Sequence, residues 1–230
     1  MANENQIAFQ SNAPRGSIVT IKNVPYQIED LQEDFMYDTI IFGSRTADVQ
    51  IAQGATFDFF MNISGKGKNY TNLQKDKSPL AGKAWKIYYV GLIARVSVGE
   101  GYASVLYAQK LLENLYLELM VTSDTVVRGP FWEWESGRGM SMYTTDNNVG
   151  TISAGVPASN SKRARIYPFD IVEQDELSAQ YTMPTTNLVD QSGNAIIDAT
   201  HPLVMKTGNV VAITLELRGL STRKGVRSGL

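Results

Sequence analysis

The sequence predicts an all-β protein, specifically a jelly-roll β-sandwich: a single jelly roll with extra strands, long loops and one short helix. About eleven to thirteen segments are rich in β-branched and aromatic residues and end at turn residues, whereas only one segment has helical periodicity. The final strand lies far along the chain from the strands it would pair with, as Greek-key and jelly-roll connections require. No repeat of roughly 20–50 residues indicates a propeller or solenoid, and two stacked jelly rolls would need about sixteen strands.

The composition is that of a folded globular chain that lacks the residues needed by several kinds of site. Of 230 residues, 43% are apolar and 19% are charged, with a formal net charge of −2, which excludes a nucleic-acid-binding domain whose whole surface is basic. The chain has no Cys, which excludes disulfide scaffolds, cysteine nucleophiles and zinc–thiolate sites. Its single histidine, His201, excludes metal centres built on two or more histidines. We therefore expect none of these kinds of metal or nucleophilic site.

The chain is expected to have three parts. Residues 1–16 are polar and are expected to form a flexible N-terminal arm, residues 17–218 the jelly-roll domain, and residues 219–230 a basic, flexible C-terminal tail. The polar start is unlike a secretory signal. The longest apolar stretch, residues 84–98, is interrupted by charged and small residues and is shorter than the roughly 20 residues that span a bilayer. We expect a soluble protein or a component of a soluble assembly.

Expected strands are apolar or alternating segments bounded by turn residues. They cover residues 17–22, 35–42, 49–52, 56–63, 84–98, 115–121, 125–134, 166–172, 179–183, 196–197 and 211–218. The strand over 84–98 exceeds the usual strand length, so we expect a bend near Gly91. In the last strand, every second residue is apolar and is expected to face the core, namely Val211, Ile213, Leu215 and Leu217.

Three other segments stand out between these strands. Residues 102–113 have apolar side chains at helical spacing and are the expected helix. Residues 64–83 form a polar loop with five Lys, three Gly and a Pro, and loops of that length usually serve binding or contacts. Residues 136–164 are a second long surface excursion rich in Gly, Ser, Thr and Asn.

The most conspicuous short motif is Trp132-Glu133-Trp134-Glu135. On a strand, the two carboxylates would share one face about 6.5–7 Å apart, a separation that a glycosidase could use. The two tryptophans, Trp132 and Trp134, could instead stack on sugar rings. Ion pairing with a nearby Arg and inward-facing tryptophans would explain the same pattern structurally. The structural interpretation is favoured over glycan contact and catalysis.

Two acidic segments are weaker candidates for binding a cation. Glu29, Asp30, Glu33 and Asp34 lie at i, i+4 spacing, and hard cations are bound by several oxygen ligands. The alternating ligands and central Gly of a calcium loop are missing, so a solvated acidic face is the favoured interpretation. Residues 146–148 (Asp-Asn-Asn) are better explained as a turn, in which the side chains bond to their own backbone.

Neither the histidine nor the Lys–Gly segment indicates an active site. His201 precedes a Pro at the entrance to a strand and has no G-x-S-x-G sequence to accompany it, although the partners of a triad need only be close in space. Residues 65–68 (Gly-Lys-Gly-Lys) resemble a phosphate loop only superficially, since the full spacing is absent. No nucleotide site is therefore predicted.

The C-terminal segment is basic. After Glu216 no acidic side chain follows, whereas four basic residues do: Arg218, Arg223, Lys224 and Arg227. Such a tail can neutralise phosphates or approach an anionic membrane surface. A solvated terminus, or an arm lying on a neighbouring subunit, is the alternative.

Three stretches carry a resemblance to a known family. They are the polar loop that leads into a long aromatic strand (residues 64–87), the strand–helix–strand passage of residues 87–121, and the Gly-turned final strand with its basic end (residues 202–219). In this layout the chain resembles the jelly-roll major capsid (coat) proteins of tailless icosahedral bacteriophages and related prokaryotic viruses. The double jelly-roll coat proteins of membrane-containing phages look similar but usually need a longer chain, which favours a single jelly roll.

The resemblance implies a structural virion protein, made in the host cytoplasm, that assembles into an icosahedral shell. It implies no enzymatic activity, no cofactor and no metal. Its partners would be other copies of itself in capsomers and shell, other virion proteins, and the genome or an internal membrane through the C-terminal tail, with no small-molecule substrate. The arm and the two long loops would make the contacts between subunits. The alternative functions are a carbohydrate-binding β-sandwich (a receptor-binding virion component) and, behind it, a β-sandwich glycosidase.

Overall fold

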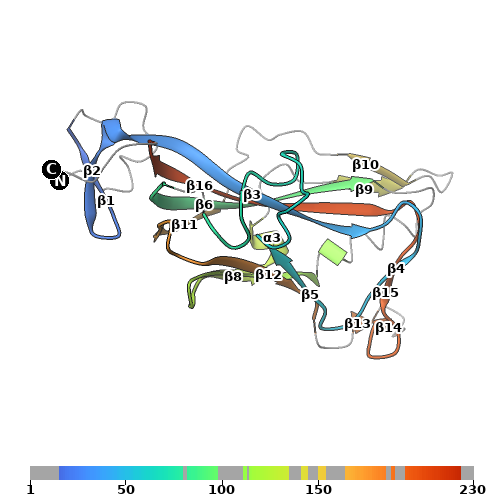
Figure 1. The fold of residues 1–230 in the computed structure, drawn as a ribbon. Coiled ribbons are helices and arrows are strands. Elements are labelled where there is room, and N and C mark those ends of the chain that lie inside the picture. The colour runs from blue at the N-terminus through green and yellow to red at the C-terminus, as the bar shows by residue number, and fades with distance from the viewer. Residues whose placement is uncertain are drawn as a thin grey trace.

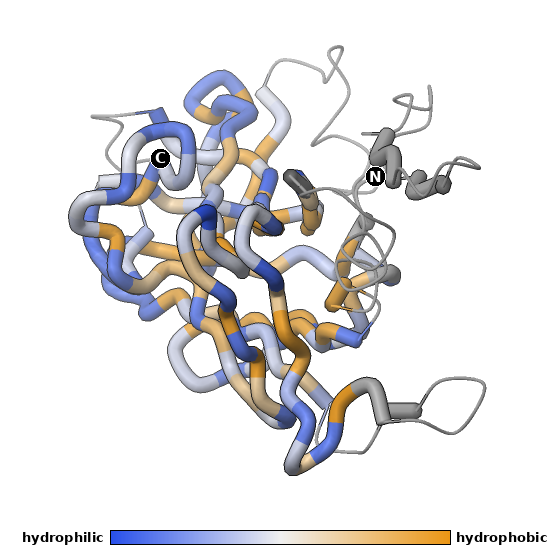
Figure 2. Tube along the Cα trace, turned by 90° about the vertical axis from the view of Figure 1, so that its right-hand side faces the viewer, coloured by the Kyte–Doolittle hydropathy of each residue, from blue (hydrophilic) through white to orange (hydrophobic). Residues whose placement is uncertain are grey.

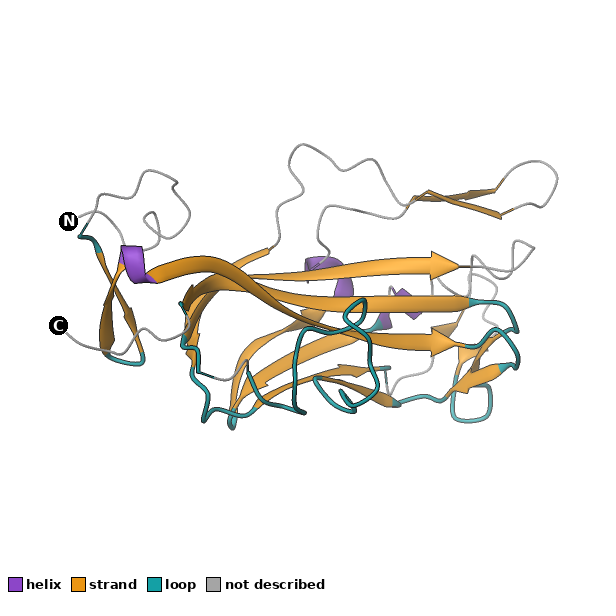
Figure 3. Cartoon of the chain, turned by 45° about the horizontal axis from the view of Figure 1, so that its top comes forward, coloured by secondary structure: helices purple, strands orange, loops and turns teal. Residues whose placement is uncertain are grey.

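The computed structural model describes residues 16–79, 82–97, 111–112, 114–134, 141–144, 150–153, 164–184, 188–189 and 195–223. These residues form two antiparallel four-stranded sheets that lie face to face as a sandwich (Figures 1 and 3). The predicted all-β class is therefore confirmed. Among the described residues, no helix is long and apolar enough to cross a membrane.

The first sheet contains the longest strands of the fold. Its order is β11 (Ala164–Ile171), β6 (Trp85–Ser97), β16 (Val210–Thr222) and β3 (Leu31–Gly43). The second sheet has the order β5 (Thr56–Phe59), β12 (Leu177–Thr182), β7 (Tyr116–Val121) and β8 (Asp124–Pro130). Consequently β3 and β5 each form an end of their sheet, and so do β11 and β8.

The eight sandwich strands form nested pairs, so that the strands nearest the two ends of the chain pair with each other and the two middle strands form a hairpin. In chain order the first pairs with the last (β3 with β16), the second with the seventh (β5 with β12), the third with the sixth (β6 with β11), and the fourth with the fifth (β7 with β8). Strands distant in sequence are thus hydrogen-bonded neighbours, as expected for the closing strand. Consecutive strands lie in opposite sheets except for the β7–β8 hairpin.

Four small two-stranded sheets and short helical segments accompany the two main sheets in the described residues. The pairs are β1 (Ile18–Ile21) with β2 (Val24–Gln27), β4 (Val49–Ile51) with β15 (Leu203–Met205), β9 (Ser141–Thr144) with β10 (Gly150–Ser153), and β13 (Leu188–Val189) with β14 (Ala195–Ile197). The helical segments include η1 (Ile28–Asp30) and α3 (Phe131–Trp134). The β1–β2 and β4–β15 pairs lie at opposite ends of the sandwich (Figure 1).

Alternation of apolar and polar residues along the strands creates the core between the sheets (Figure 2). In β7, Leu117, Leu119 and Val121 are buried, and in β16 the four residues predicted to face inward are fully buried. Thr214 and Glu216, which alternate with them, are also buried. Thr214 and Glu216 are buried because β16 is a central strand, with β3 on one side and β6 on the other. The Thr214 hydroxyl is 2.8 Å from that of Thr39.

A second, smaller cluster packs at the end of the first sheet beside the β1–β2 hairpin. It consists of Val19, Ile21, Leu31, Tyr88 and Leu220. The burial of Tyr88 results from a β-bulge. Tyr89 pairs with Arg218 and Ile87 with Gly219, so β6 has one residue more than β16 at this point. Gly91, where a bend was predicted, pairs regularly with Glu216, and the register shift of β6 lies at Tyr88 instead.

Several predicted boundaries differ from the structure. The strand predicted over 56–63 ends at Phe59, and the strand predicted over 125–134 ends at Pro130, after which α3 begins. Within the predicted surface excursion 136–164, β9 and β10 pair as a hairpin. The helix predicted over 102–113 lies mostly outside the described residues, although Leu111, Leu112 and Asn114 are helical.

Tyr181 provides a test of the core. Its ring packs edge-on against Phe59 with centroids 5.3 Å apart, burial raises its pKa well above the usual range, and no described residue hydrogen-bonds its hydroxyl. Since an unsatisfied buried hydroxyl costs free energy, Tyr181→Phe should leave the free energy of unfolding unchanged or raise it by about 1 kcal/mol in urea denaturation. Tyr37→Phe is the control, because the Tyr37 hydroxyl donates to the Lys68 carbonyl and its loss should destabilise the fold. A clear loss of stability in Tyr181→Phe would contradict the prediction.

Candidate functional site

An open groove lies between the edges of the two sheets. Its walls are β3, β5 and the segment that follows β5, and its volume is about 550 Å³. It is lined by Thr39, Ile40, Ile41, Thr56, Phe57, Asp58, Met61, Asn62, Gly65, Lys66 and Tyr70. Edge strands border it because β3 ends the first sheet and β5 ends the second, on the same side of the sandwich. The rings of Phe42 and Phe57 meet edge-on between the two strands, with centroids 4.6 Å apart.

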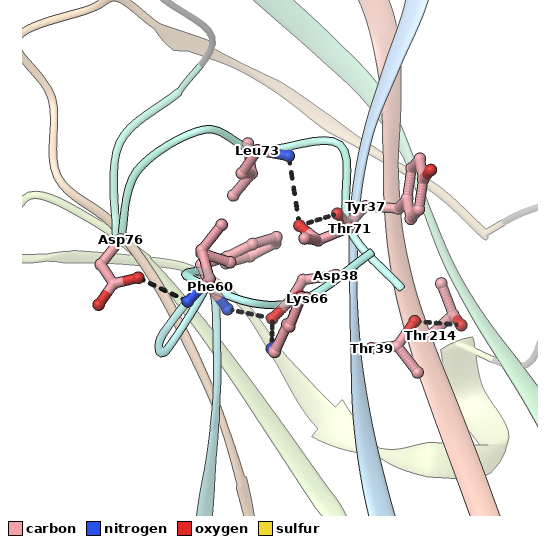
Figure 4. Close-up of polar contacts among 10 residues, drawn as sticks. Tyr37, Asp38, Thr39, Phe60, Lys66, Thr71, Leu73, Asp76 and Thr214 are labelled. Carbon is pink, nitrogen blue, oxygen red and sulfur yellow. Dashed lines mark hydrogen bonds and ion pairs between the residues drawn. The ribbon is translucent and has the colours of Figure 1, made fainter. Parts of the chain in front are cut away.

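A buried carboxylate anchors the loop beside this groove. Asp38 occupies an inward-facing position of β3, and its side chain is fully buried. The ammonium of Lys66 donates to both of its oxygens, at 2.9 and 2.8 Å, and the backbone N–H of Phe60 donates to one of them at 2.7 Å (Figure 4). A buried charge is tolerated when it is paired and hydrogen-bonded in this way. The arrangement attaches two points of the segment that follows β5 to β3: Phe60, directly after β5, and Lys66, within the loop of residues 64–83.

The loop also covers part of the free edge of β3. Thr71 forms an isolated antiparallel bridge with Asp38, and the Thr71 hydroxyl donates to the Tyr37 carbonyl at 3.0 Å. Asn72 acts like a residue of a neighbouring strand. Its backbone N–H and its side-chain oxygen bond to the carbonyl and N–H of Tyr37, and its side-chain nitrogen donates to the Phe35 carbonyl at 2.7 Å. The edge of β3 is therefore occupied along residues 35–38.

Sequence reasoning missed the pair of Asp38 and Lys66. Asp38 is the charged residue within the apolar segment 35–42, and a charge at an inward position of a strand is a signal that a partner must be present. Lys66 belongs to the Gly-Lys-Gly-Lys segment that resembles a phosphate loop, and its ammonium is engaged by Asp38. The structure gives this lysine a structural partner in place of a phosphate.

The Trp–Glu motif does not form the arrangement that a strand would give. Phe131–Trp134 is a helical turn, so the strand spacing of 6.5–7 Å expected for Glu133 and Glu135 does not apply, and Glu135 lies outside the described residues. Trp134 is half-buried and packs against the main core. The side chain of Trp132 also lies outside the described residues. The strand predicted at Glu133 was therefore wrong, and the separation of the two carboxylates lies outside the described residues.

The acidic residues near the N-terminus are distributed over separate contacts. Glu29 accepts a hydrogen bond from the Gly16 backbone N–H at 2.8 Å, Asp34 pairs with Lys83, and Glu33 pairs with Arg218 at 3.1 Å. Asp30 ends η1, and its carbonyl accepts from the Arg223 backbone. Among the described residues, no group of three or more His, Asp or Glu is placed to hold a metal ion. Residues 146–148 lie outside the described residues.

His201 lies in a turn with Asp198. Its Nδ1 is 3.0 Å from a carboxylate oxygen of Asp198 and 3.0 Å from the Thr200 hydroxyl. These hydrogen bonds, first that of His201 and then those of Thr200, hold the pKa of Asp198 well below its ordinary value. In a catalytic triad the acid binds Nδ1 and the nucleophile faces Nε2. Here the carboxylate and the hydroxyl both face Nδ1, so these three residues form a turn and not a triad.

The basic residues near the C-terminus belong partly to the sheet. Arg218 lies in β16, bonds to Glu33 and Glu216, and has its guanidinium 5.7 Å from the Phe35 ring centroid. Strand β16 continues to Thr222, so residues 219–222 belong to the sandwich and not to the tail. Arg223 is exposed directly after this strand. Lys224 and Arg227 lie outside the described residues.

Comparisons with known proteins add little to this site. No family model matches the chain, and no curated protein matches it. Among solved structures, dimeric latent PorU from Porphyromonas gingivalis is 10% identical, with a TM-score of 0.21, over 84% of this chain and 13% of that chain. The chain thus spans a small part of that structure, and a likeness this weak carries no argument about fold or function.

Proposed function

We propose that this chain is a jelly-roll coat protein that assembles with copies of itself into an icosahedral shell. The nested pairing of the eight sandwich strands is the observation that carries the proposal. A jelly roll is a long antiparallel hairpin rolled into two four-stranded sheets, which requires the pairs first–last, second–seventh, third–sixth and fourth–fifth. The pairs β3–β16, β5–β12, β6–β11 and β7–β8 agree with that requirement.

The step from fold to function rests on the uses of this architecture. Jelly rolls occur in viral capsid and lectin domains and in cupins, so the architecture alone selects no single activity. A metal-binding cupin is disfavoured because the sequence has one histidine. Of the remaining uses, capsid assembly agrees best with the resemblance in the loop, strand and closing segments.

Exposed apolar side chains on the described surface also support contacts between subunits. Ile41 and Phe35 on β3 are 51% and 41% exposed, and Tyr167 on β11 is 91% exposed. Exposed apolar residues on the edge strands at both sides of the first sheet suit lateral neighbours in a shell. Repeated heterologous contacts of this kind close around symmetry axes.

Light scattering combined with negative-stain microscopy of the purified protein tests the proposal. We expect closed particles, or symmetric capsomers with three to six times the 25.4 kDa mass of one chain. Because many weak contacts act together in a shell, the particles should persist on dilution well below the concentration at which they formed. A monomer of 25.4 kDa at high protein concentration would overturn the proposal.

Glycan binding is a second candidate function, and the groove is a better candidate site for it than the tryptophans. Tyr70 is 39% exposed and lines the groove together with Asn62 and Asp58, which provides one aromatic face beside hydrogen-bonding side chains. Trp85, in contrast, is fully buried. Binding of free glycans by the monomeric protein, abolished by Tyr70→Ala, would favour this function. If a Trp134 variant lost glycan binding while Tyr70→Ala retained it, the groove would not be the glycan site.

A further inference from the structure

We propose that the groove between β3 and β5 receives residues 6–9 of a second copy of this chain, added as a strand to the free edge of β3. The inference rests on the proposed self-assembly and deepens it by naming the two surfaces that meet. Extended segments commonly bind proteins by adding a strand to an exposed sheet edge, where main-chain hydrogen bonds give affinity and side-chain pockets give specificity.

The backbone of β3 provides the template. Backbone groups on an edge strand point alternately toward and away from the neighbouring strand. The N–H and the carbonyl of Tyr37 both face away from β16, because both bond to Asn72. By the same period of two, the backbone groups of Ile41 face away from β16. No described strand pairs with this side of β3, and the loop that covers it does so only along residues 35–38 and their bridge at Thr71.

The walls of the groove fit an extended segment with apolar residues on one face. Ile41 is 51% exposed at the rim, and Phe57 and Met61 line the opposite wall. An exposed, unpaired and apolar edge is a site where another chain pairs, unless charged residues block it. The one lysine in the lining, Lys66, is engaged by Asp38 and does not block the edge.

Residues 6–10 (Gln-Ile-Ala-Phe-Gln) have the matching pattern. Ile7 and Phe9 would point to one face of a strand and the glutamines to the other, and both apolar residue types favour strands. With Ala8 opposite Ile41, Ile7 and Phe9 would lie on the core-facing side of β3 that Phe42 shares, beside Phe57. Within residues 1–15 they are the only large apolar side chains besides Met1. The segment carries no charge of its own, so it can lie beside Asp58 without repulsion.

The geometry favours a second copy over the same chain. Gly16 is held beside Glu29, just before β3 begins, by a hydrogen bond of 2.8 Å. An arm running back along its own β3 with equal spacing would bring residues 7–9 beside residues 36–38. Thr71 and Asn72 already occupy that part of the edge. The stretch around Ile41 is therefore open to a segment that arrives from a neighbouring molecule.

Engineered disulfides test this directly, because the chain has no Cys and therefore no background. In the variant Ala8→Cys with Ile41→Cys, which places the two Cys on directly opposite residues, mild oxidation of the assembled protein should give covalent oligomers at least fivefold more abundant than in a matched control. The control is Ala8→Cys with Tyr116→Cys, since Tyr116 on β7 is similarly exposed at 44% but lies away from the groove. A disulfide needs Cα atoms within about 7 Å, so only the correct register is trapped.

Light scattering before oxidation separates the two proposals. Particles that cross-link equally in both variants, or that give only intrachain disulfides, would overturn the groove assignment and leave self-assembly intact. Monomers in every variant and in the wild type would overturn both. Particles with selective intermolecular cross-linking at Ile41 would support both.

Discussion

Replacing Lys66 with methionine is expected to lower the free energy of unfolding by about 3 kcal/mol, measured by urea denaturation at neutral pH. The substitution keeps an unbranched side chain, shorter by the one terminal atom, and removes the ammonium that bonds to both oxygens of Asp38. Because the Asp38 carboxylate is fully buried, its charge would then face the backbone N–H of Phe60 as its one remaining described partner. Removing one partner of a buried ion pair costs more than the pair itself contributes.

Two companion variants identify the cause of this loss. Lys68→Met removes an exposed lysine two residues further along the same loop and should change stability by less than about 0.5 kcal/mol. Asp38→Asn retains an oxygen that can accept from Phe60 and frees Lys66, whose side chain is 22% exposed, to reach water. It should therefore cost less than Lys66→Met. Equal stability of Lys66→Met and the wild type would show that the buried pair does not hold the loop.

The strands of the sandwich were predictable because their patterns are local. Period-two alternation in residues 211–218 correctly indicated the core-facing residues of β16, and the strand predicted over 115–121 is present as β7. The bulge at Tyr88 was not predictable in position, because it depends on Gly219 of a strand more than one hundred residues away. The ends of β5 and β8 were also misjudged, since residues 60–63 and 131–134 are apolar enough to look like continuing strand. Phe60 instead has a positive φ of 62°, which ends the extended conformation.

The candidate site was less predictable than the fold. The groove exists because β3 and β5 are the end strands on one side of the sandwich, and strand order is a property of the whole chain. The Trp–Glu motif drew attention because of its composition, but α3 changes its spacing. Asp38 carried the more useful signal, since a carboxylate inside an apolar strand requires a partner, and the partner lies 28 residues away. Periodicity can indicate the need for a partner but not its identity.

The second large effect is expected at Gly219. A Cβ at this position would lie 1.9 Å from the carbonyl oxygen of Lys86 and 2.8 Å from the Cα of Ile87, distances that real Cβ atoms do not show. Both atoms are backbone in β6, next to the bulge at Tyr88, so neither can rotate away as a side chain would. Gly219→Ala should therefore lower the free energy of unfolding by about 3 kcal/mol, the upper part of the range for overpacking.

Two glycines of the long loop supply the controls that separate overlap from backbone strain. Gly67 has open space around it and no positive φ, so Gly67→Ala should change stability by less than about 0.5 kcal/mol. Gly65 also has open space but a φ of +88°, so Gly65→Ala should cost about 1 kcal/mol from strain alone.

A loss at Gly219 well above the loss at Gly65 would place its cause in the contact between β16 and β6. That contact also holds the end of the sandwich, because Lys86 donates to the Thr20 carbonyl of β1 at 2.8 Å and lies 3.5 Å from Asp170 of β11. Moving the Lys86 backbone to make room for a methyl group would thus disturb the β1–β2 hairpin together with the sheet. Thermal unfolding followed by proteolysis between β1 and β3 should show this hairpin becoming cleavable in Gly219→Ala at a temperature where the wild type is protected. If protection from proteolysis and the free energy of unfolding were both unchanged, β6 and β16 would be able to separate at the bulge without loss of stability.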